Sequence, residues 1–580
     1  MWPFKSSYPV KALAELKSHY DFIVVGGGTG GCLLARRLSE DPRFSVLLVE
    51  RGDASNSFLD TTPLLSMHHL STGKHSTVFD SVPDSRLGRS WTLITGLGLG
   101  GTSRINANIY TCGVPAQYNA WHAQGRDGWS YDEMKPYFMR SQNWTGPVPQ
   151  EDHGVDGPLD VRSFEAYTHG CSLRAAEAAR KIGFRQTVDV NSPFEPSTGV
   201  NKVQYTLDAS GRRHSSFRAF LPADVVANRP NLHVCCGVIA TKLEISNGND
   251  NTLSAEAVEL QRFSGGSAKR VITARREIVL CCGALRTPQL LLLSGVGPQE
   301  HLREVGIPVV KHAPGVGNHL QDHILVQSSF NCPMADSLYS VFRQPLTLLR
   351  ELYNYLRHGT GALQCFMVET EIFSLSSVIS ADGTPTALSA EQQDPYSPDN
   401  VPDICVMIST VGDPRRPGTD HLKGTMGIDA GLMLAKSTGH LRLRSRDPRA
   451  QPICDMRYAT SPDDRKALRA ALRVTAAMAE QLRVDGYPLE AVHAPDTTSD
   501  VALDEYIDEN VETMYHYSST CRMAPEEDEC PGVIDDKLRV HGIRKLRIAD
   551  ASVFPNCPAA HPQAVVYAFA GKCADLMLRS

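Results

Sequence analysis

Three glycines and one acid near the start of the chain could bind a dinucleotide. Gly26, Gly28 and Gly31 have the spacing G-x-G-x-x-G between an apolar, β-branched run and a helix-like segment. Because glycine has no side chain, such a turn can approach a pyrophosphate at the positive end of a helix. Glu50 ends a second apolar run, where a carboxylate can accept hydrogen bonds from an adenosine ribose. This order of strand, turn, helix, strand and acid predicts a nucleotide site that also includes Thr29 and Gly30.

A second glycine-rich stretch follows at residues 96–121, GLGLGGTSRINANIYTCGVPAQYNAW. Its amides and hydroxyls can donate hydrogen bonds to a phosphate or to a flavin ring. The stretch resembles the first signature of the glucose-methanol-choline (GMC) oxidoreductases, with matches at Gly100, Gly101, Ser103, Asn106, Gly113, Tyr118 and Trp121. Residues 278–297, IVLCCGALRTPQLLLLSGVG, resemble the second signature of that family. The likeness is to members of the aryl-alcohol oxidase and glucose oxidase type.

The resemblance implies FAD as the cofactor and indicates which residues hold it. Beyond the first turn, it points to Gly101, Thr102, Ser103, Asn106, Ala107, Ala240, Asp550, Ala551, His561, Pro562 and Gln563. Ala240 lies in residues 231–243, which read as one strand, and would contact adenine through its main chain. Some relatives bond a histidine covalently to the flavin just before the asparagine; Ile105 stands there, so we expect non-covalent FAD.

The resemblance also implies a catalytic pair, His516 and His561. An imidazole with an ordinary pKa of about 6.5 can take the hydroxyl proton of an alcohol at neutral pH. A second polar group can hold the oxygen so that the carbon–hydrogen bond points at flavin N5. We therefore expect His516 to be the general base and His561 to be its partner. Relatives usually have glycine where this chain has Ser519, which could narrow the pocket or alter contact with the flavin.

The fold class expected is α/β, with a Rossmann-like FAD-binding domain and a substrate-binding domain built on an antiparallel sheet with helices. The FAD-binding domain is predicted to be discontinuous, at residues 18–160, 210–323 and 530–580. Residues 161–209 and 324–529 are assigned to the substrate-binding domain. Within this second domain, Leu346 to Leu356 has the apolar spacing of a helix.

Composition limits the possible partners. The 580 residues carry 58 basic and 64 acidic side chains in an interspersed pattern, so we expect neither nucleic acid nor a membrane as a partner. The amino-terminal residues lack the apolar core of a signal peptide, which favours a cytoplasmic location with reduced cysteines. His68 and His69 are adjacent, and neighbouring side chains point apart with no acid nearby in the pattern, so no metal site is predicted. The oligomeric state is left open.

The predicted function is oxidation of a primary alcohol, an aromatic or allylic small molecule, to the aldehyde by hydride transfer to flavin N5, in specialised metabolism. Oxygen or another acceptor would reoxidise the flavin. One alternative is a non-redox cyclase or dehydratase of a natural-product pathway that retains FAD. A remote third is fatty-acid photodecarboxylation, whose enzymes use a cysteine and an arginine in the pocket; residues 433–436 bring no cysteine.

Overall fold

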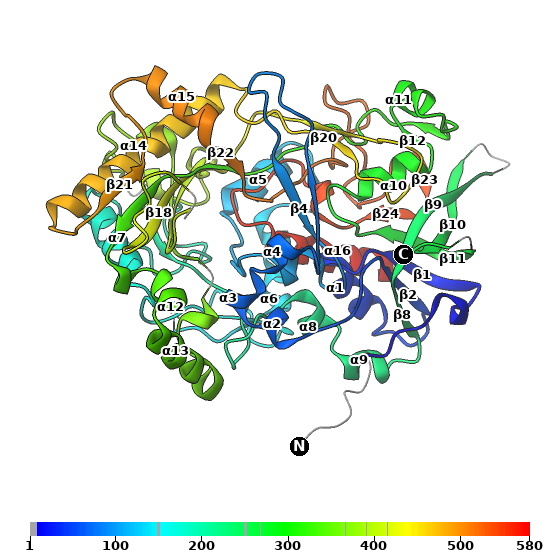
Figure 1. The fold of residues 1–580 in the computed structure, drawn as a ribbon. Coiled ribbons are helices and arrows are strands. Elements are labelled where there is room, and N and C mark those ends of the chain that lie inside the picture. Colours follow the sequence, from blue (N-terminus) through cyan, green and yellow to red (C-terminus); the bar gives the residue numbers. More distant parts are fainter. Residues whose placement is uncertain are drawn as a thin grey trace.

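The computed structural model describes residues 8–147, 151–248, 252–266, 268–365, 367–389, 391–413 and 416–579. In these residues the strands form two eight-stranded sheets and several two-stranded ones (Figure 1). The first sheet carries the first glycine turn of the predicted FAD site, and the second sheet is antiparallel. The predicted fold class, a Rossmann-like domain joined to an antiparallel-sheet domain, is confirmed.

The first sheet is built around β1 (His19–Val25), which pairs in parallel with β2 (Val46–Glu50) and β11 (Lys269–Leu280). Parallel strands are covered on both faces, and β2 accordingly is buried along its whole length. The sheet also contains β8 (Leu232–Cys236), β9 (Val238–Asn247), β10 (Leu253–Arg262), β23 (Ile543–Arg544) and β24 (Leu546–Ile548). Residues 231–243 were predicted to be one strand, but they form β8 and β9. Gly237, with a φ of +71°, separates the two.

Two helices from opposite ends of the chain pack against each other over the first sheet. They are α1 (Thr29–Leu38), which begins directly after Gly28, and α16 (Gln563–Arg579). Small and apolar residues line the contact, and their burial joins the carboxy-terminal segment to the amino-terminal glycine turn. This contact brings His561 and Gln563 toward the nucleotide-binding end of β1.

The second sheet runs in the order β21 (Glu490–His493), β15 (Ser329–Cys332), β18 (Gly424–Leu432), β17 (Ile404–Ser409), β16 (Val368–Ser374) and β7 (Gly199–Lys202). β14 (Ile324–Val326) pairs with both β18 and β22 (Val511–Thr513). Two helices, α7 (Gly170–Lys181) and α14 (Pro462–Val484), cover one face. The exact boundaries of the two domains remain a prediction.

Residues 345–358 form the helix α13 (Pro345–His358), which confirms the apolar spacing noted between Leu346 and Leu356. All fifteen cysteines are free, and Cys530 alone among them is exposed. No helix in the described part of the chain is both long and apolar enough to cross a membrane.

Candidate flavin and catalytic site

The first glycine turn contains glycines of two kinds. A Cβ on Gly26 would lie 2.4 Å from the carbonyl oxygen of Cys281, and one on Gly31 would lie 1.9 Å from the carbonyl oxygen of Gly26. Packing therefore requires glycine at these two positions. A Cβ on Gly28 would find its nearest atoms at 3.7 and 4.0 Å, which are ordinary contacts. No close contact in the described protein demands glycine at position 28, so the bare backbone there fits a pyrophosphate group.

Glu50 links the two glycine-rich stretches. Its Oε2 accepts the amide of Gly27 at 2.8 Å, and its Oε1 accepts the amides of Gly52 and Gly98 at 2.8 and 3.0 Å. The predicted ribose-binding acid thus also holds the second stretch beside the first. Each carboxylate oxygen has two acceptor sites, so Oε2 keeps one for a ribose hydroxyl.

Asn106 connects the second glycine-rich stretch to the start of α16. Its Nδ2 donates to Oε1 of Gln563, and its Oδ1 accepts from Nη1 of Arg213 at 2.7 Å. Ser103 donates to the carbonyl of Gly100 at 2.6 Å. The amide side chains of Asn106 and Gln563 are therefore fixed by the protein at the place where the resemblance puts the flavin.

The remaining predicted cofactor residues come from separate segments of the chain. Buried Asp550 accepts from the amide of Gly283 and the hydroxyl of Thr287, at 2.8 and 2.6 Å, and burial raises its pKa. The carbonyl of Ala551 accepts the amide of Ser519 at 3.0 Å. Thr102 lies in the short turn 101–104, Ala107 and Ala240 are half-buried, and Pro562 precedes α16.

His516 and His561 come together although distant in the sequence. Their ring centroids are 5.2 Å apart, and the ring planes cross at 88°. His516 follows β22, and His561 lies just before α16, so the contact joins the second sheet to the helix that covers the first. The structure thus places the two predicted catalytic imidazoles as a facing pair.

A third imidazole stands behind the pair. Nδ1 of His323 is 2.9 Å from Nδ1 of His516, and Nε2 of His323 is 3.1 Å from Sγ of Cys557. Burial lowers the pKa of His323 to about 3. Burial, with the neighbouring imidazoles of His323 and His561, lowers the pKa of His516 well below its usual value. Both rings are therefore neutral at neutral pH.

Two buried carboxyl groups hold the backbone and ring of this pair. Oε1 of Glu371, on β16, is 2.8 Å from Nε2 of His561. Oδ1 of Asp322 accepts the amide of His516 at 2.7 Å, and its Oδ2 accepts from Tyr458 and Thr513 at 2.5 and 2.6 Å. Burial raises the pKa of Asp322 to about 7 despite these hydrogen bonds.

Sequence reasoning missed His323, Glu371 and Cys557. His323 ends the stretch GVGNHLQDH, whose sequence resembles a connecting segment and does not by itself indicate a catalytic role. Glu371 did leave a signal: it is an acid inside VETEIFS, a strand in which every residue is buried. An acid in a fully buried strand needs a partner, and here that partner is His561.

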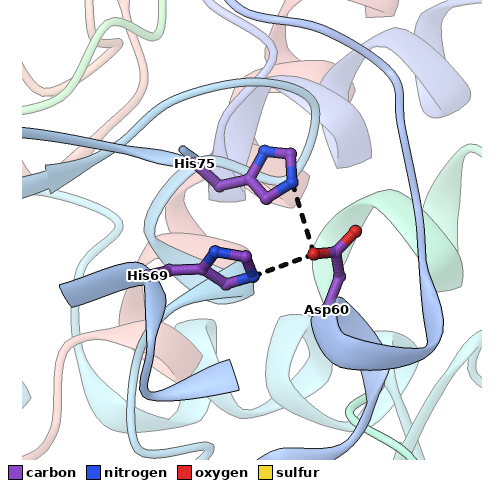
Figure 2. A group of neighbouring side chains, drawn as sticks. All are labelled: Asp60, His69 and His75. Carbon is purple, nitrogen blue, oxygen red and sulfur yellow. Dashed lines mark ion pairs between the residues drawn. The ribbon is translucent and has the colours of Figure 1, made fainter. Parts of the chain in front are cut away.

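The prediction for His68 and His69 was wrong in its reasoning. Their rings lie 3.8 Å apart, tilted by 44°, and an acid does accompany them. Figure 2 shows that His69 and His75 both point at the carboxylate of Asp60. The distances from Oδ1 of Asp60 are 2.8 Å to Nε2 of His69 and 3.3 Å to Nε2 of His75, and all three residues are buried.

This cluster offers a metal-ligand set, but its charges favour another role. Nη2 of buried Arg104 lies 3.5 Å from Oδ2 of Asp60 and 3.4 Å from Nε2 of His75. A divalent cation at this point would stand beside a guanidinium, which is always charged. The arrangement therefore fits a network that holds Arg104, the last residue of the turn 101–104, better than a metal site.

Comparisons with known proteins agree with this geometry. Models of the family described as GMC oxidoreductase match residues 20–325 and 435–570. Oxygen-dependent choline dehydrogenase 1 of Chromohalobacter salexigens is 32% identical over 96% of this chain and 94% of its own length. An FAD-dependent oxidoreductase from Chaetomium thermophilum superposes with a TM-score of 0.84 at 26% identity, over 97% of this chain and 99% of that one. Formate oxidase superposes with a TM-score of 0.85 at 25% identity, over 97% and 98%.

The matched residues contain both glycine turns and both histidines of the facing pair. The relatives and the similar structures both extend over nearly the whole chain. The glycine cradle at Gly28 suits the dinucleotide cofactor that these proteins use. The chain belongs to the GMC family of FAD-dependent oxidoreductases.

Proposed function

We propose that the protein oxidises a primary alcohol to the aldehyde, with His516 as general base and His561 as its partner. The observation that carries this proposal is the facing pair of imidazoles at 5.2 Å, each with one nitrogen already bonded inside the protein. His516 uses Nδ1 toward His323, and His561 uses Nε2 toward Glu371. Nε2 of His516 and Nδ1 of His561 remain for a substrate hydroxyl.

The contacts of Cys557 support the tautomer in which His516 can act as a base. The thiol donates to the carbonyl of His516 at 3.8 Å, so its sulfur can accept from Nε2 of His323. Nδ1 of His323 is then an acceptor and takes the hydrogen on Nδ1 of His516. That leaves an unshared electron pair on Nε2 of His516, which can remove the hydroxyl proton.

The other groups orient the substrate and keep the pair fixed. Glu371 accepts from Nε2 of His561, which fixes the orientation of this ring beside His516. Asp322 fixes the backbone of His516. When FAD is bound by the glycine turns, Glu50 and Asp550, it supplies the acceptor for the hydride that leaves the alcohol carbon.

The substrate class that we propose is a neutral aromatic or allylic alcohol. Oε1 of Glu371, the carboxylate nearest the pair, is already engaged with Nε2 of His561 at 2.8 Å, and on this ground we propose a neutral alcohol rather than a cation such as choline. The choline dehydrogenase relative is described as oxygen-dependent, and we propose oxygen or another small acceptor for the second half-reaction. A role in specialised metabolism and a cytoplasmic location belong to the same proposal.

An anaerobic absorbance titration tests the function. The purified holoprotein is mixed with benzylic, allylic and aliphatic alcohols and with choline, and the flavin band near 450 nm (about the usual position) is followed. Bleaching by benzylic or allylic alcohols is the expected result. Bleaching by choline alone would mean that the substrate is a cationic alcohol and not a neutral aromatic or allylic one. A flavin that none of these alcohols bleaches would favour the alternative, a cyclase or dehydratase that retains FAD.

A further inference from the structure

The helix α13 presents an apolar stripe to solvent. Four of its large side chains are exposed, by 62% to 82% of their surface, and they follow the spacing of one helix face: Leu346, Leu349, Tyr353 and Leu356. The opposite face is buried through Glu351 and Tyr355, which pack on the protein. The stripe therefore does not serve the core, and Figure 1 shows the helix at the edge of the molecule.

The exposed charged side chains of α13 are both basic. They are Arg350 and Arg357, and the single acid of the helix, Glu351, is buried. Glu351 accepts the amide of Ala362 at 2.9 Å and pairs with Arg350, whose side chain remains 67% exposed. Arg350 and Arg357 are seven residues apart and thus lie on one side of the apolar stripe.

We propose that α13 docks the enzyme onto an anionic membrane surface, lying in the plane of the interface. An amphipathic helix with large apolar side chains on one face and arginines beside them binds in this way: the apolar face enters the headgroup boundary and the guanidiniums meet lipid phosphates. This revises the expectation that no membrane is a partner. It is independent of the proposed chemistry, because no residue of α13 contacts His516 or His561 in the structure as described.

A second copy of the chain fits this surface less well. Fourteen residues of helix are about 21 Å long, so a stripe one helix face wide covers far less than the roughly 800 Å² per partner that a stable dimer needs. A two-fold contact would also present each copy with the same exposed basic charges, and it would supply no acid to complement them.

Vesicle co-sedimentation of the full-length holoprotein tests the proposal. We expect binding to phosphatidylcholine vesicles that contain phosphatidylserine, weaker binding to phosphatidylcholine alone, and loss of binding as salt is raised. Leu349→Gln with Leu356→Gln should lower the partition coefficient by at least about tenfold. Arg357→Gln should lower it about fivefold. Val501→Gln, at an equally exposed apolar residue of the helix α15 (Asp500–Asn510), is the matched control and should bind as the wild type does.

Activity on a soluble alcohol, unchanged in all variants, checks that they fold. Absence of binding to anionic vesicles, or equal binding by the leucine variant, would overturn the proposal. So would a dimer of the wild-type protein in analytical ultracentrifugation that the leucine variant loses, because the stripe would then be covered by a second copy.

Discussion

At the scale of single residues, the site depends on which nitrogen of each imidazole carries hydrogen. His516→Ala removes the proposed base, so the rate of flavin reduction by an alcohol should fall about 10²–10⁴-fold. FAD should stay bound, because the glycine turns are untouched. Anaerobic stopped-flow absorbance measures both. His122→Ala, on the exposed side of the helix α5 (Pro115–Ala123), is the control. A near-normal rate in His516→Ala would show that His516 is not the general base.

The pH dependence of reduction should reflect the lowered pKa of His516. A base works in its unprotonated form, which persists above its pKa. The reduction rate should therefore stay level as the pH falls from about 8 to about 6, through the ordinary imidazole value of about 6.5, and should decline only at lower pH. Stopped-flow rates across this range decide the matter: half of the rate lost near pH 6.5 would mean that His516 has an ordinary pKa.

Variants of Cys557 test the proposed tautomer of His516 separately from the role of His516 as the base. Cys557→Ala removes the acceptor for Nε2 of His323, so the His516 tautomer is no longer selected and reduction should slow by about tenfold, the loss expected when a supporting hydrogen bond to a base or ligand is removed. Cys557→Ser keeps an acceptor at that position and should restore most of the rate. A merely structural thiol would show no such rescue. Equal rates for the two variants would contradict the proposed hydrogen bonds from Cys557 through His323 to His516.

At the scale of elements, the glycine turn before α1 separates folding from cofactor binding. Gly28→Ala adds a Cβ that meets only ordinary contacts in the protein, so the melting temperature of the apoprotein should stay close to that of the wild type. The same atom would occupy the space of a pyrophosphate, so FAD should be lost on gel filtration. Gly31→Ala is the contrasting variant and should fail to fold, because its Cβ would overlap the backbone of Gly26. A yellow Gly28→Ala protein would refute the placement of the phosphate.

Elements that depend on local pattern were predictable. The sequence from β1 to β2 carries its own order of strand, turn, helix and acid, and the structure follows it. The break between β8 and β9 was not predicted, because one glycine in an apolar run does not by itself indicate that a strand ends there. Ser519 has a φ of +64° and is fully buried, which explains in physical terms why relatives usually have glycine there.

At the scale of the whole molecule, the proposed catalytic pair joins the second sheet to the helix that covers the first. Glu371 reaches His561 across 190 positions of sequence, and His323 reaches His516 across 193. No local pattern encodes such contacts, so the resemblance could indicate the two histidines but not the groups that hold them. The contacts of His323 and Cys557 could be found only once the chain was folded.

The contact between Glu371 of β16 and His561 predicts that a residue of the second sheet affects the rate of alcohol oxidation. Glu371→Gln keeps the size of the side chain but weakens its bond to Nε2 of His561. We expect kcat to fall by about tenfold or more while FAD retention and melting temperature change little. Glu369→Gln, two residues away on the same strand, is the matched control, since its carboxylate accepts from the backbone of Thr168 and His169. Equal losses in the two variants would argue for a general effect on the sheet.

The exposed side chain of Cys530 provides a natural labelling site on the protein surface. Because Cys530 is the single exposed thiol of fifteen, a maleimide dye or a thiol-counting reagent should react with the native protein first at this position. Cys236 and Cys282 are partly exposed, and the other twelve are buried and become reactive only when the structure opens, so the late phase of labelling would follow unfolding without any engineered probe. A dye at Cys530 would also give one fixed point on the surface from which distances to a bound vesicle or to the flavin can be measured by energy transfer.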